Sequence, residues 1–198
     1  MFISFEGIDG CGKTTQLQFL ATQLQQREIE VVCTREPGGT PLAEGLREIL
    51  LHSVSPIEKR GELLLFGAAR AQHVAQIVRP ALHRGAWVLC DRFADSSEAY
   101  QGGGLEIDRD FIRQMNDFAT AQTRPQRTFL FDLDPQIAFS RRRGEKDDRI
   151  EKRGLEFQAK VRAAYLEIAE RDPKRVVVLD ASQSREAIAT QILAVLEL

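Results

Sequence analysis

Residues 2–15 read FISFEGIDGCGKTT, and this stretch decides the fold of the chain. Gly7, Gly12, Lys13 and Thr14 occupy the positions of a G-x-x-x-x-G-K-[ST] phosphate-binding loop. The apolar residues before Gly7 predict a buried strand, and the residues after Thr14 have the period of a helix. Glycines in such a loop let backbone N–H groups converge on an anion at the helix N-terminus. We therefore expect a nucleoside triphosphate to bind here.

The loop supplies the residues that we expect to bind the phosphates of ATP. Lys13 provides a cation for the β- and γ-phosphates, and the Thr14 hydroxyl can ligate Mg²⁺. A glycine-rich turn that happens to precede a lysine is the alternative, but it leaves the strand before and the helix after unexplained. The predicted ATP-binding residues are Gly7, Ile8, Asp9, Gly10, Cys11, Gly12, Lys13, Thr14 and Thr15.

The composition is that of an ordinary globular protein. The chain has 198 residues, of which 43% are hydrophobic and 28% charged, enough for one domain with a sizeable core. A net charge of −2 argues against a broad nucleic-acid surface, and no apolar run approaches the roughly 20 residues of a membrane span. Three scattered cysteines predict neither a disulfide framework nor a zinc site. We expect residues 1–198 to form a single cytoplasmic domain without a signal peptide.

Five short apolar segments alternate with helical ones along the chain. The segments that predict strands are 2–6, 29–34, 87–91, 128–133 and 176–179. Their alternation with helices predicts an α/β fold, in which a five-stranded parallel sheet has helices on both faces, as in phosphate-loop NTP hydrolases. A long helix is expected over 57–84, kinked or divided at Pro80. The glycines at 102–104 predict a flexible turn.

Asp91 closes the third predicted strand. An aspartate at the end of an apolar strand in a phosphate-loop protein stands where Mg²⁺ is held, directly or through water. The alternative is that Asp91 caps the helix that follows it. The predicted metal-binding residues are therefore Thr14 and Asp91.

Residues 141–149 read RRRGEKDDR, a dense charged segment that contains a glycine. In an arbitrary protein this would be a solvated helix end. In a phosphate-loop protein a mobile arginine-rich segment can instead close over the triphosphate as a lid. We expect a short lid at about 140–150, and its candidate catalytic residues are Arg141, Arg142, Arg143 and Arg149.

These motifs together resemble the bacterial thymidylate kinases, a family of phosphate-loop nucleoside-monophosphate kinases. The resemblance covers nearly the whole chain. It rests on the loop and on TREPGGT at 34–40, LF-x-x-x-R at 65–70, DRF at 91–93, SS-x-x-YQG at 96–102 and DRIE at 148–151. It implies transfer of the γ-phosphoryl of ATP to dTMP with Mg²⁺, giving dTDP for dTTP biosynthesis. It also implies a homodimer paired through helices beside the sheet.

The resemblance implies roles for individual residues as well. Arg92 would clamp the acceptor phosphate, Phe66 would stack on thymine, and Arg70 would donate to its O4 oxygen. Tyr100 would leave too little room for a ribose 2′-hydroxyl. Gly10 stands where many eukaryotic members carry an arginine, so the lid would supply that charge. The implied dTMP site comprises Asp9, Glu36, Arg47, Phe66, Arg70, Arg92, Ser97, Tyr100 and Gln101, and Lys13 and Arg92 join the lid arginines as catalytic residues.

The chemistry of the reaction favours the same hypothesis. A phosphate acceptor is already an anionic nucleophile, so the reaction needs cations rather than a general base. One rival is another deoxynucleotide or deoxynucleoside kinase of the same fold, where Glu36 would serve as the base. A second rival is a regulatory phosphate-loop NTPase, which needs a water-positioning residue and a partner surface. An assay with ATP, Mg²⁺ and each monophosphate or nucleoside separates these alternatives.

Overall fold

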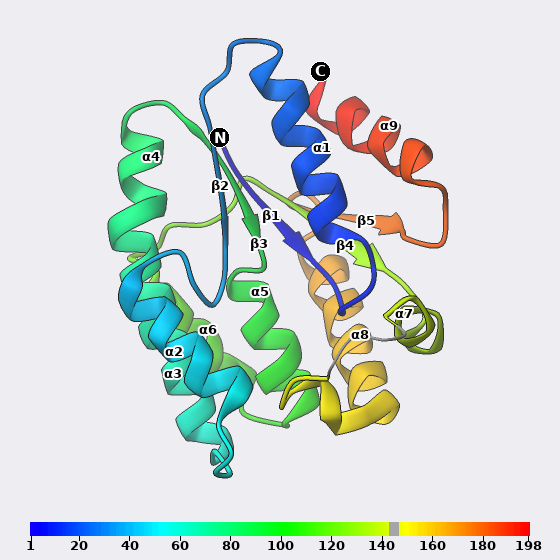
Figure 1. Ribbon diagram of the computed structural model, residues 1–198. Helices are drawn as coiled ribbons and strands as arrows, with labels where there is room; N and C mark the ends of the chain where they lie inside the picture. The colour runs from blue at the N-terminus through cyan, green and yellow to red at the C-terminus, as the bar shows by residue number, and fades with distance from the viewer. Residues whose placement is uncertain (143–146) are drawn as a thin grey trace.

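The computed structural model describes residues 1–142 and 147–198, and its centre is one parallel sheet between layers of helices (Figure 1). The strands lie in the order β2-β3-β1-β4-β5, and all neighbouring strands are parallel. Their bounds are β1 (Phe2–Glu6), β2 (Val31–Arg35), β3 (Trp87–Asp91), β4 (Arg127–Asp132) and β5 (Val176–Asp180). The predicted five-stranded parallel α/β fold is confirmed.

Helices cover both faces of the sheet. Helices α1 and α9 pack on each other and against the strands on one side, while α4 packs on β3 and α8 packs on β4 and β5. None of the described helices combines the length and the apolar composition that a bilayer crossing demands. The α-helices are α1 (Lys13–Gln25), α2 (Pro41–His52), α3 (Lys59–His73), α4 (Arg79–His83), α5 (Ala94–Ser97), α6 (Arg109–Ala119), α7 (Pro135–Arg141), α8 (Gly154–Arg171) and α9 (Arg185–Leu196). Two π-helices, η1 (Val74–Val78) and η2 (Glu98–Gly104), and the 3₁₀-helix η3 (Glu151–Arg153) complete the set.

Side chains of the central strands alternate between two cores. Ile3 and Leu89 belong to the core under α1, whereas Phe2 and Val88 pack with residues of η1 and α4. Successive side chains of a strand point to opposite faces, so continuous apolar strands are buried on both sides. This explains why the strands read as apolar runs rather than alternating patterns.

The helix expected over 57–84 consists of three consecutive segments, α3, η1 and α4. The π-helix η1 lies directly before the turn that contains Pro80. Proline has no backbone N–H, and its ring clashes with the carbonyl four residues earlier. The wider π-turn accommodates the ring, so the chain stays helical through the proline.

The glycines at 102–104 do not form the predicted turn, because they end the π-helix η2. A Cβ atom on Gly103 would lie 2.4 Å from the Cβ of Ala164, and one on Gly104 would lie 2.4 Å from the Phe157 ring. Both of these neighbours belong to α8. The glycines therefore allow close packing of two helices, a reason that local sequence patterns do not reveal.

The topology brings two motifs to one edge of the sheet. Strand β1 ends at the phosphate loop, and its neighbour β3 ends at Asp91, directly before Arg92. The strand order reverses at β1, and open α/β sheets bind ligands outside the carboxyl ends of their strands at such a point. The phosphate loop and Asp91 must therefore face the same space.

Candidate active site

A cavity of about 1060 Å³ opens at this edge of the sheet. Single small ligands usually occupy 300–1,000 Å³ or so, and this cavity therefore has room for two substrates. Among the predicted site residues, those that line it are Asp9, Gly10, Cys11, Gly12, Lys13, Thr14, Thr15, Glu36, Arg47, Phe66, Arg70, Asp91, Arg92, Ser97, Tyr100, Gln101, Arg141 and Arg142. Gly7 and Ile8 lie behind the lining, and Arg149 is likewise not part of it.

The phosphate loop depends on two glycines. Gly7 has a φ of +136°, and a Cβ atom there would lie 2.6 Å from the carbonyl oxygen of Phe131. Gly12 has a φ of +94° and caps α1 without a side chain. This cap leaves the first N–H groups of α1 open to an anion, as a phosphate site requires.

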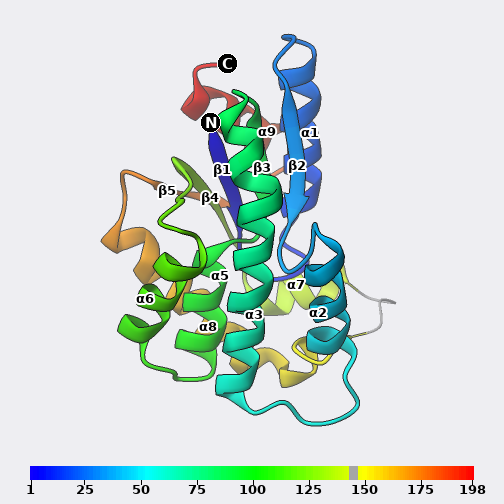
Figure 2. The same ribbon diagram turned by 90° about the vertical axis from the view of Figure 1, so that its left-hand side faces the viewer.

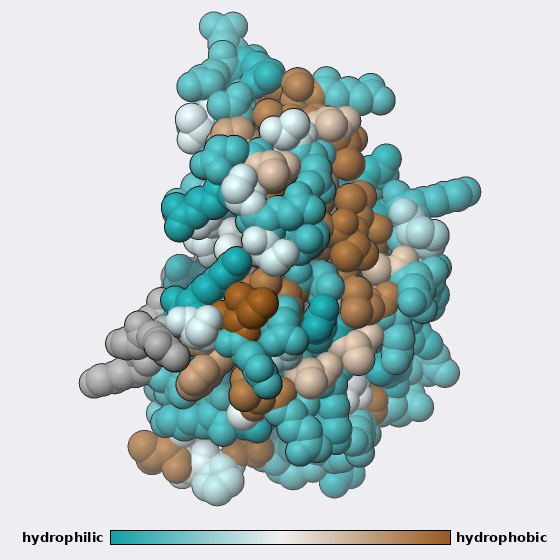
Figure 3. Space-filling model, turned by 90° about the vertical axis from the view of Figure 1, so that its right-hand side faces the viewer, coloured by the Kyte–Doolittle hydropathy of each residue, from teal (hydrophilic) through white to brown (hydrophobic). Residues whose placement is uncertain are grey.

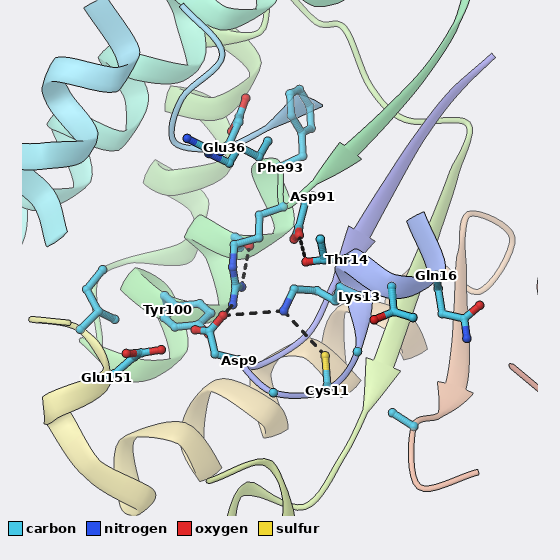
Figure 4. A pocket seen from close by; sticks show the side chains of 18 of the residues that line it. Asp9, Cys11, Lys13, Thr14, Gln16, Glu36, Asp91, Phe93, Tyr100 and Glu151 are labelled. Carbon is cyan, nitrogen blue, oxygen red and sulfur yellow. Dashed lines mark hydrogen bonds and ion pairs between the residues drawn. The ribbon is translucent and has the colours of Figure 1, made fainter. Parts of the chain in front are cut away.

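Lys13 lies under the loop that it belongs to, with only 5% of its surface exposed. Its Nζ donates to the Ile8 carbonyl oxygen at 2.9 Å and lies 3.8 Å from Asp9 Oδ1 (Figure 4). A cation in this place faces the phosphates that the loop would bind. Lys13 is also a packed residue, unlike an ordinary surface lysine.

Thr14 and Asp91 form the predicted metal-binding pair. The Thr14 hydroxyl donates to Asp91 Oδ2 at 2.7 Å, and both residues line the cavity (Figure 4). Phe93, not Asp91, occupies the N-cap of α5, and α5 has no side-chain cap, so the capping alternative is wrong. Within residues 1–142 and 147–198, no group of three His, Cys, Asp or Glu side chains forms a metal cluster. A hydroxyl beside one carboxylate suits Mg²⁺, which prefers oxygen ligands and keeps several waters.

Arg92 projects into the cavity from a strained backbone. Its φ is +68°, a left-handed value that is uncommon for residues other than glycine. Its NH2 donates to Asp9 Oδ1 at 2.7 Å and to the Tyr100 hydroxyl at 3.1 Å. Burial by itself would raise the pKa of Asp9, but the Arg92 and Lys13 cations outweigh it and hold that pKa well below its usual range. Asp9 is therefore ionised and keeps the guanidinium in place.

Glu6 lies behind Arg92 and is fully buried. One carboxyl oxygen accepts from the Phe93 N–H at 2.7 Å, and the other accepts from the hydroxyls of Ser96 at 2.6 Å and Tyr165 at 2.8 Å. Burial, with a further contribution from Asp95, raises the pKa of Glu6 to about 7. Sequence analysis assigned Glu6 no role, although an acidic residue that closes an apolar strand is a usable signal.

Arg70 lines the cavity and is not a surface charge, since only 1% of it is exposed. Phe66 also lines the cavity, one turn earlier on α3. Arg70 donates to Glu36 Oε2 at 2.7 Å, Ser97 Oγ at 3.0 Å, Asn116 Oδ1 at 2.5 Å and the Phe93 carbonyl oxygen at 3.1 Å. A guanidinium has five N–H groups. One of them therefore has no partner among the described residues.

A buried network holds Glu36 in turn. Its Oε1 lies 2.9 Å from His73 Nδ1, and His73 Nε2 lies 2.8 Å from the Thr34 hydroxyl. His73 and Asn116 both support the site, yet neither belongs to a motif that sequence analysis singled out. Their partners lie tens of residues away along the chain, so no local pattern identifies them.

The lid arginines are in different places. Arg141 donates to the Ala181 carbonyl oxygen at 3.0 Å, and Arg142 pairs with Glu151 and with Asp147. Arg149 instead donates to the Leu50 carbonyl oxygen at 2.7 Å and to Glu62 at 2.6 Å. Arg143 lies outside the described residues. Arg141 and Arg142 therefore line the cavity. Arg149 lies outside the lining and ties its own segment to α2 and α3 through Leu50 and Glu62.

Further residues also line the cavity. Asp148 Oδ1 accepts from the N–H groups of Ile150 and Glu151, and Glu151 Oε2 accepts from the Asp148 N–H at 2.9 Å. This reciprocal pair is a capping box, which its D-x-x-E spacing could have revealed. The segment after β5 contributes Ala181, Gln183, Ser184, Arg185 and Ile188 to the lining.

The fold and this cavity define a class of protein. A phosphate loop, a hydroxyl–carboxylate pair suited to Mg²⁺ and a second, arginine-lined pocket share one space. This is the arrangement of a phosphate-loop kinase, an enzyme that holds a nucleoside triphosphate and an acceptor side by side.

Comparisons with known proteins give the particular family. A sequence profile described as Thymidylate kinase matches residues 5–192. The chain is 48% identical to the thymidylate kinase of Symbiobacterium thermophilum over 100% of this chain and 92% of that protein. It is 47% identical to that of Pseudomonas putida (strain W619), over 99% and 96%. The chain belongs to the thymidylate kinase family.

A solved structure agrees with this assignment. The crystal structure of thymidylate kinase from Ehrlichia chaffeensis superposes with a TM-score of 0.81 at 37% identity, covering 99% of this chain and 98% of that one. The predictions of the family, the fold class and a kinase activity are confirmed.

The buried Glu6 leads to a testable pH dependence of stability. Its pKa in the folded protein, about 7, lies above the ordinary value of 4.5, so the folded state binds this proton more tightly. The group therefore lowers the free energy of unfolding as the pH rises from about 4.5 to about 7, by about 3 kcal/mol in total. Glu6→Gln resembles the neutral carboxyl and lacks this titration. We expect urea denaturation to show the variant gaining stability relative to the wild type between pH 5 and pH 8. A difference that does not change with pH would contradict the assignment.

Proposed function

We propose that the protein transfers the γ-phosphoryl of ATP to the phosphate of dTMP, forming ADP and dTDP in dTTP biosynthesis. The observation that carries this proposal is the shared cavity, which the phosphate loop, Arg92, Phe66 and Arg70 all line, with Arg92 bonded to Asp9 of the loop. Membership of the thymidylate kinase family supports it. A deoxynucleoside kinase would need Glu36 as a free base, but Arg70 and His73 both hold that carboxylate.

Each half of the cavity has a role in this reaction. On the donor side, the loop N–H groups and Lys13 would bind the phosphates of ATP. On the acceptor side, the Arg92 guanidinium would hold the dTMP phosphate, and a planar fork suits that task. These cations bring two anions together and stabilise the charge on the moving phosphoryl group. Asp9 orients Arg92 in the proposal, because its carboxylate bonds the guanidinium.

Thr14 and Asp91 would hold Mg²⁺ at the start of α1. When bound, the ion would neutralise charge on the β- and γ-phosphate oxygens. The 2.7 Å contact between the Thr14 hydroxyl and Asp91 Oδ2 supports this proposal, because it brings the two candidate oxygen ligands together.

The remaining acceptor residues would recognise the nucleoside. Phe66 would stack on thymine, and the free N–H of Arg70 would donate to O4. Ser97 would act through Arg70, to which its hydroxyl is bonded, and Gln101 would contact the base directly. Tyr100 would exclude a ribose 2′-hydroxyl. Arg47, whose guanidinium donates to the Pro37 carbonyl oxygen, would contribute charge at the edge of this pocket.

An activity screen tests the reaction. ATP and Mg²⁺ with each nucleoside and monophosphate should give rapid ADP formation with dTMP. Lys13→Met should lower kcat by about 10²–10³, as does the loss of a preorganised transition-state donor. Because Lys13 is packed, a melting curve and dTMP binding must first show that the variant is folded. Turnover of a nucleoside in place of dTMP, or near-full kcat in the folded variant, would contradict the proposal.

We propose that Arg141 and Arg142, together with Arg143, supply the lid charge, and that Arg149 only attaches the lid. Charge that meets the phosphoryl group in the closed state should affect kcat more than ground-state binding. Arg142→Met should therefore lower kcat by about tenfold or more while the Kd for dTMP changes little. Arg149→Met is the matched comparison, with a smaller effect on kcat. Equal kcat in the wild type and both variants would refute this division of roles.

We further propose that the protein is a homodimer joined through α3 and α6. These helices pack side by side at one side of the molecule (Figure 2). They expose Leu64, Phe111 and Phe118, the last with 88% of its surface accessible. The opposite side shows several separate apolar areas among hydrophilic residues (Figure 3). Exposed apolar side chains on two neighbouring helices favour a subunit contact there.

Light scattering after size exclusion tests the dimer. Phe118→Glu should convert the dimer into a monomer, because an unpaired charge would be buried at its centre. Phe139→Glu, at an equally apolar exposed position on α7, should leave the dimer intact. A monomeric wild type, or a Phe118→Glu variant that stays dimeric, would exclude this face.

The proposal treats residues 1–198 as one nucleoside-monophosphate kinase domain with its lid at about 140–150. A cytoplasmic location, where ATP and dTMP are both present, stays a prediction.

A further inference from the structure

Helix α3 presents three functional side chains in a row. Glu62, Phe66 and Arg70 are four residues apart, so they lie on one face of the helix, one turn after another. Phe66 and Arg70 line the acceptor half of the cavity. Glu62 lies behind the lining and is fully buried. Burying a carboxylate is costly unless it is paired, so the position of Glu62 behind this pocket calls for an explanation.

Glu62 binds partners from two parts of the chain. Its Oε1 accepts from Gln101 Nε2 at 3.0 Å and from Arg153 NH1 at 3.1 Å. Its Oε2 accepts from Arg149 NH2 and Arg153 NH2, each at 2.6 Å. Burial alone would raise the pKa of Glu62, but the hydrogen bonds and charges of Arg153, Gln101 and Arg149 lower it below the ordinary value. Glu62 is therefore an ionised group that can only accept hydrogen bonds.

This chemistry decides which way the Gln101 amide faces. A side-chain amide has an NH₂ donor end and a carbonyl acceptor end of nearly the same shape. A carboxylate accepts from the NH₂ end and repels the carbonyl oxygen. With Nε2 bonded to Glu62, Oε1 accepts no hydrogen bond from any described residue, although Gln101 lines the cavity. The cavity therefore contains an oriented acceptor.

We propose that Glu62 is a positioning residue that sets the choice of acceptor base by fixing the Gln101 amide. This inference rests on the proposed function. The acceptor on Gln101 and the remaining N–H of Arg70 form a pair that matches the ring N3–H and the O4 of thymine. Cytosine presents the opposite pattern, an unprotonated N3 and an amino group. It would meet an acceptor with an acceptor and a donor with a donor, and polar mismatches of this kind are strongly rejected in dry sites.

The same carboxylate also reaches the lid. Arg149 stands at the end of the proposed lid and Arg153 follows it in sequence, and Arg149 is held further by the Leu50 carbonyl oxygen. Glu62 therefore joins the segment behind the lid to the base pocket. Changes at Glu62 should then alter two separable quantities: base preference through Gln101, and kcat through the arginines.

The experiment measures kcat/KM for dTMP, dCMP and dUMP. In Glu62→Gln, residue 62 can donate as well as accept, so the Gln101 amide is free to turn over. The dTMP/dCMP ratio should fall roughly tenfold, the size of one lost hydrogen bond. The dTMP/dUMP ratio should not change, because uracil has the same N3–H and O4 and differs only in the methyl group. A merely structural disturbance of the pocket would alter both ratios.

Two further variants complete the test. Arg153→Met removes another partner of Glu62 and keeps the bond to Gln101, so its dTMP/dCMP ratio should equal that of the wild type. The exchange Glu62→Gln with Gln101→Glu keeps a donor–acceptor pair and again offers a carboxylate oxygen to the base, so it should recover the ratio. If Glu62→Gln alone does not fold, the dTMP/dCMP ratio of the exchange variant still tests the role of Glu62.

The outcomes separate this inference from the proposed function. A wild type without dTMP turnover refutes the proposed function itself. If the wild type phosphorylates dTMP, four results refute the role of Glu62 and leave the proposed function standing. In Glu62→Gln, these are an unchanged dTMP/dCMP ratio or an equal fall of the dTMP/dCMP and dTMP/dUMP ratios. In the other variants, they are an equal fall of the dTMP/dCMP ratio in Arg153→Met or a folded exchange variant that does not recover this ratio.

Discussion

The parallel pairing of β1 with β3 is the constraint on which the rest of this structure depends. It places the residue after Glu6 and the residue after Asp91 at the same edge of the sheet, though more than 80 residues separate them in the chain. The Thr14–Asp91 contact and the Arg92–Asp9 ion pair both follow from this register. A slip of one residue in a strand would turn every side chain to the opposite face and separate these partners.

Buried ion pairs hold side chains in the cavity lining and directly behind it. Arg70 is held by Glu36, and Glu62 by Arg149 and Arg153, with hydrogen bonds to neutral groups satisfying what remains. Burying ions costs more than an apolar packing of similar volume, so such pairs are weak evidence for stability alone. Their contribution is orientation, because each ion pair holds a hydrogen-bond donor or acceptor in a fixed position. Opposite charges on α3 and its neighbours therefore hold polar side chains of the cavity in defined orientations.

Beside the phosphate loop, backbone conformation and hydrogen bonds likewise fix the orientation of Arg92. Arg92 keeps a left-handed φ because its N–H bonds the Phe5 carbonyl oxygen and its side chain bonds Asp9 and Tyr100. Strained residues persist only where their surroundings over-determine them, and such residues gather at functional sites. Glu6 belongs to this support, since it holds the N–H of the next residue, Phe93, and the Ser96 hydroxyl.

The sequence by itself determined the features that depend on neighbours along the chain. The phosphate loop, its strand and its helix, the carboxylate Asp91 and the helical spacing of Phe66 and Arg70 were all predictable, because glycine conformation, apolar runs and helical period are local properties. Only the tertiary structure decided that Gly103 and Gly104 serve helix packing, that Arg149 pairs with Glu62, and that His73 and Asn116 hold Glu36 and Arg70. Each of these depends on a partner brought near by the packing of distant segments. Hydrogen bonds and steric contacts act over a few ångströms in space, and sequence spacing carries no record of that distance.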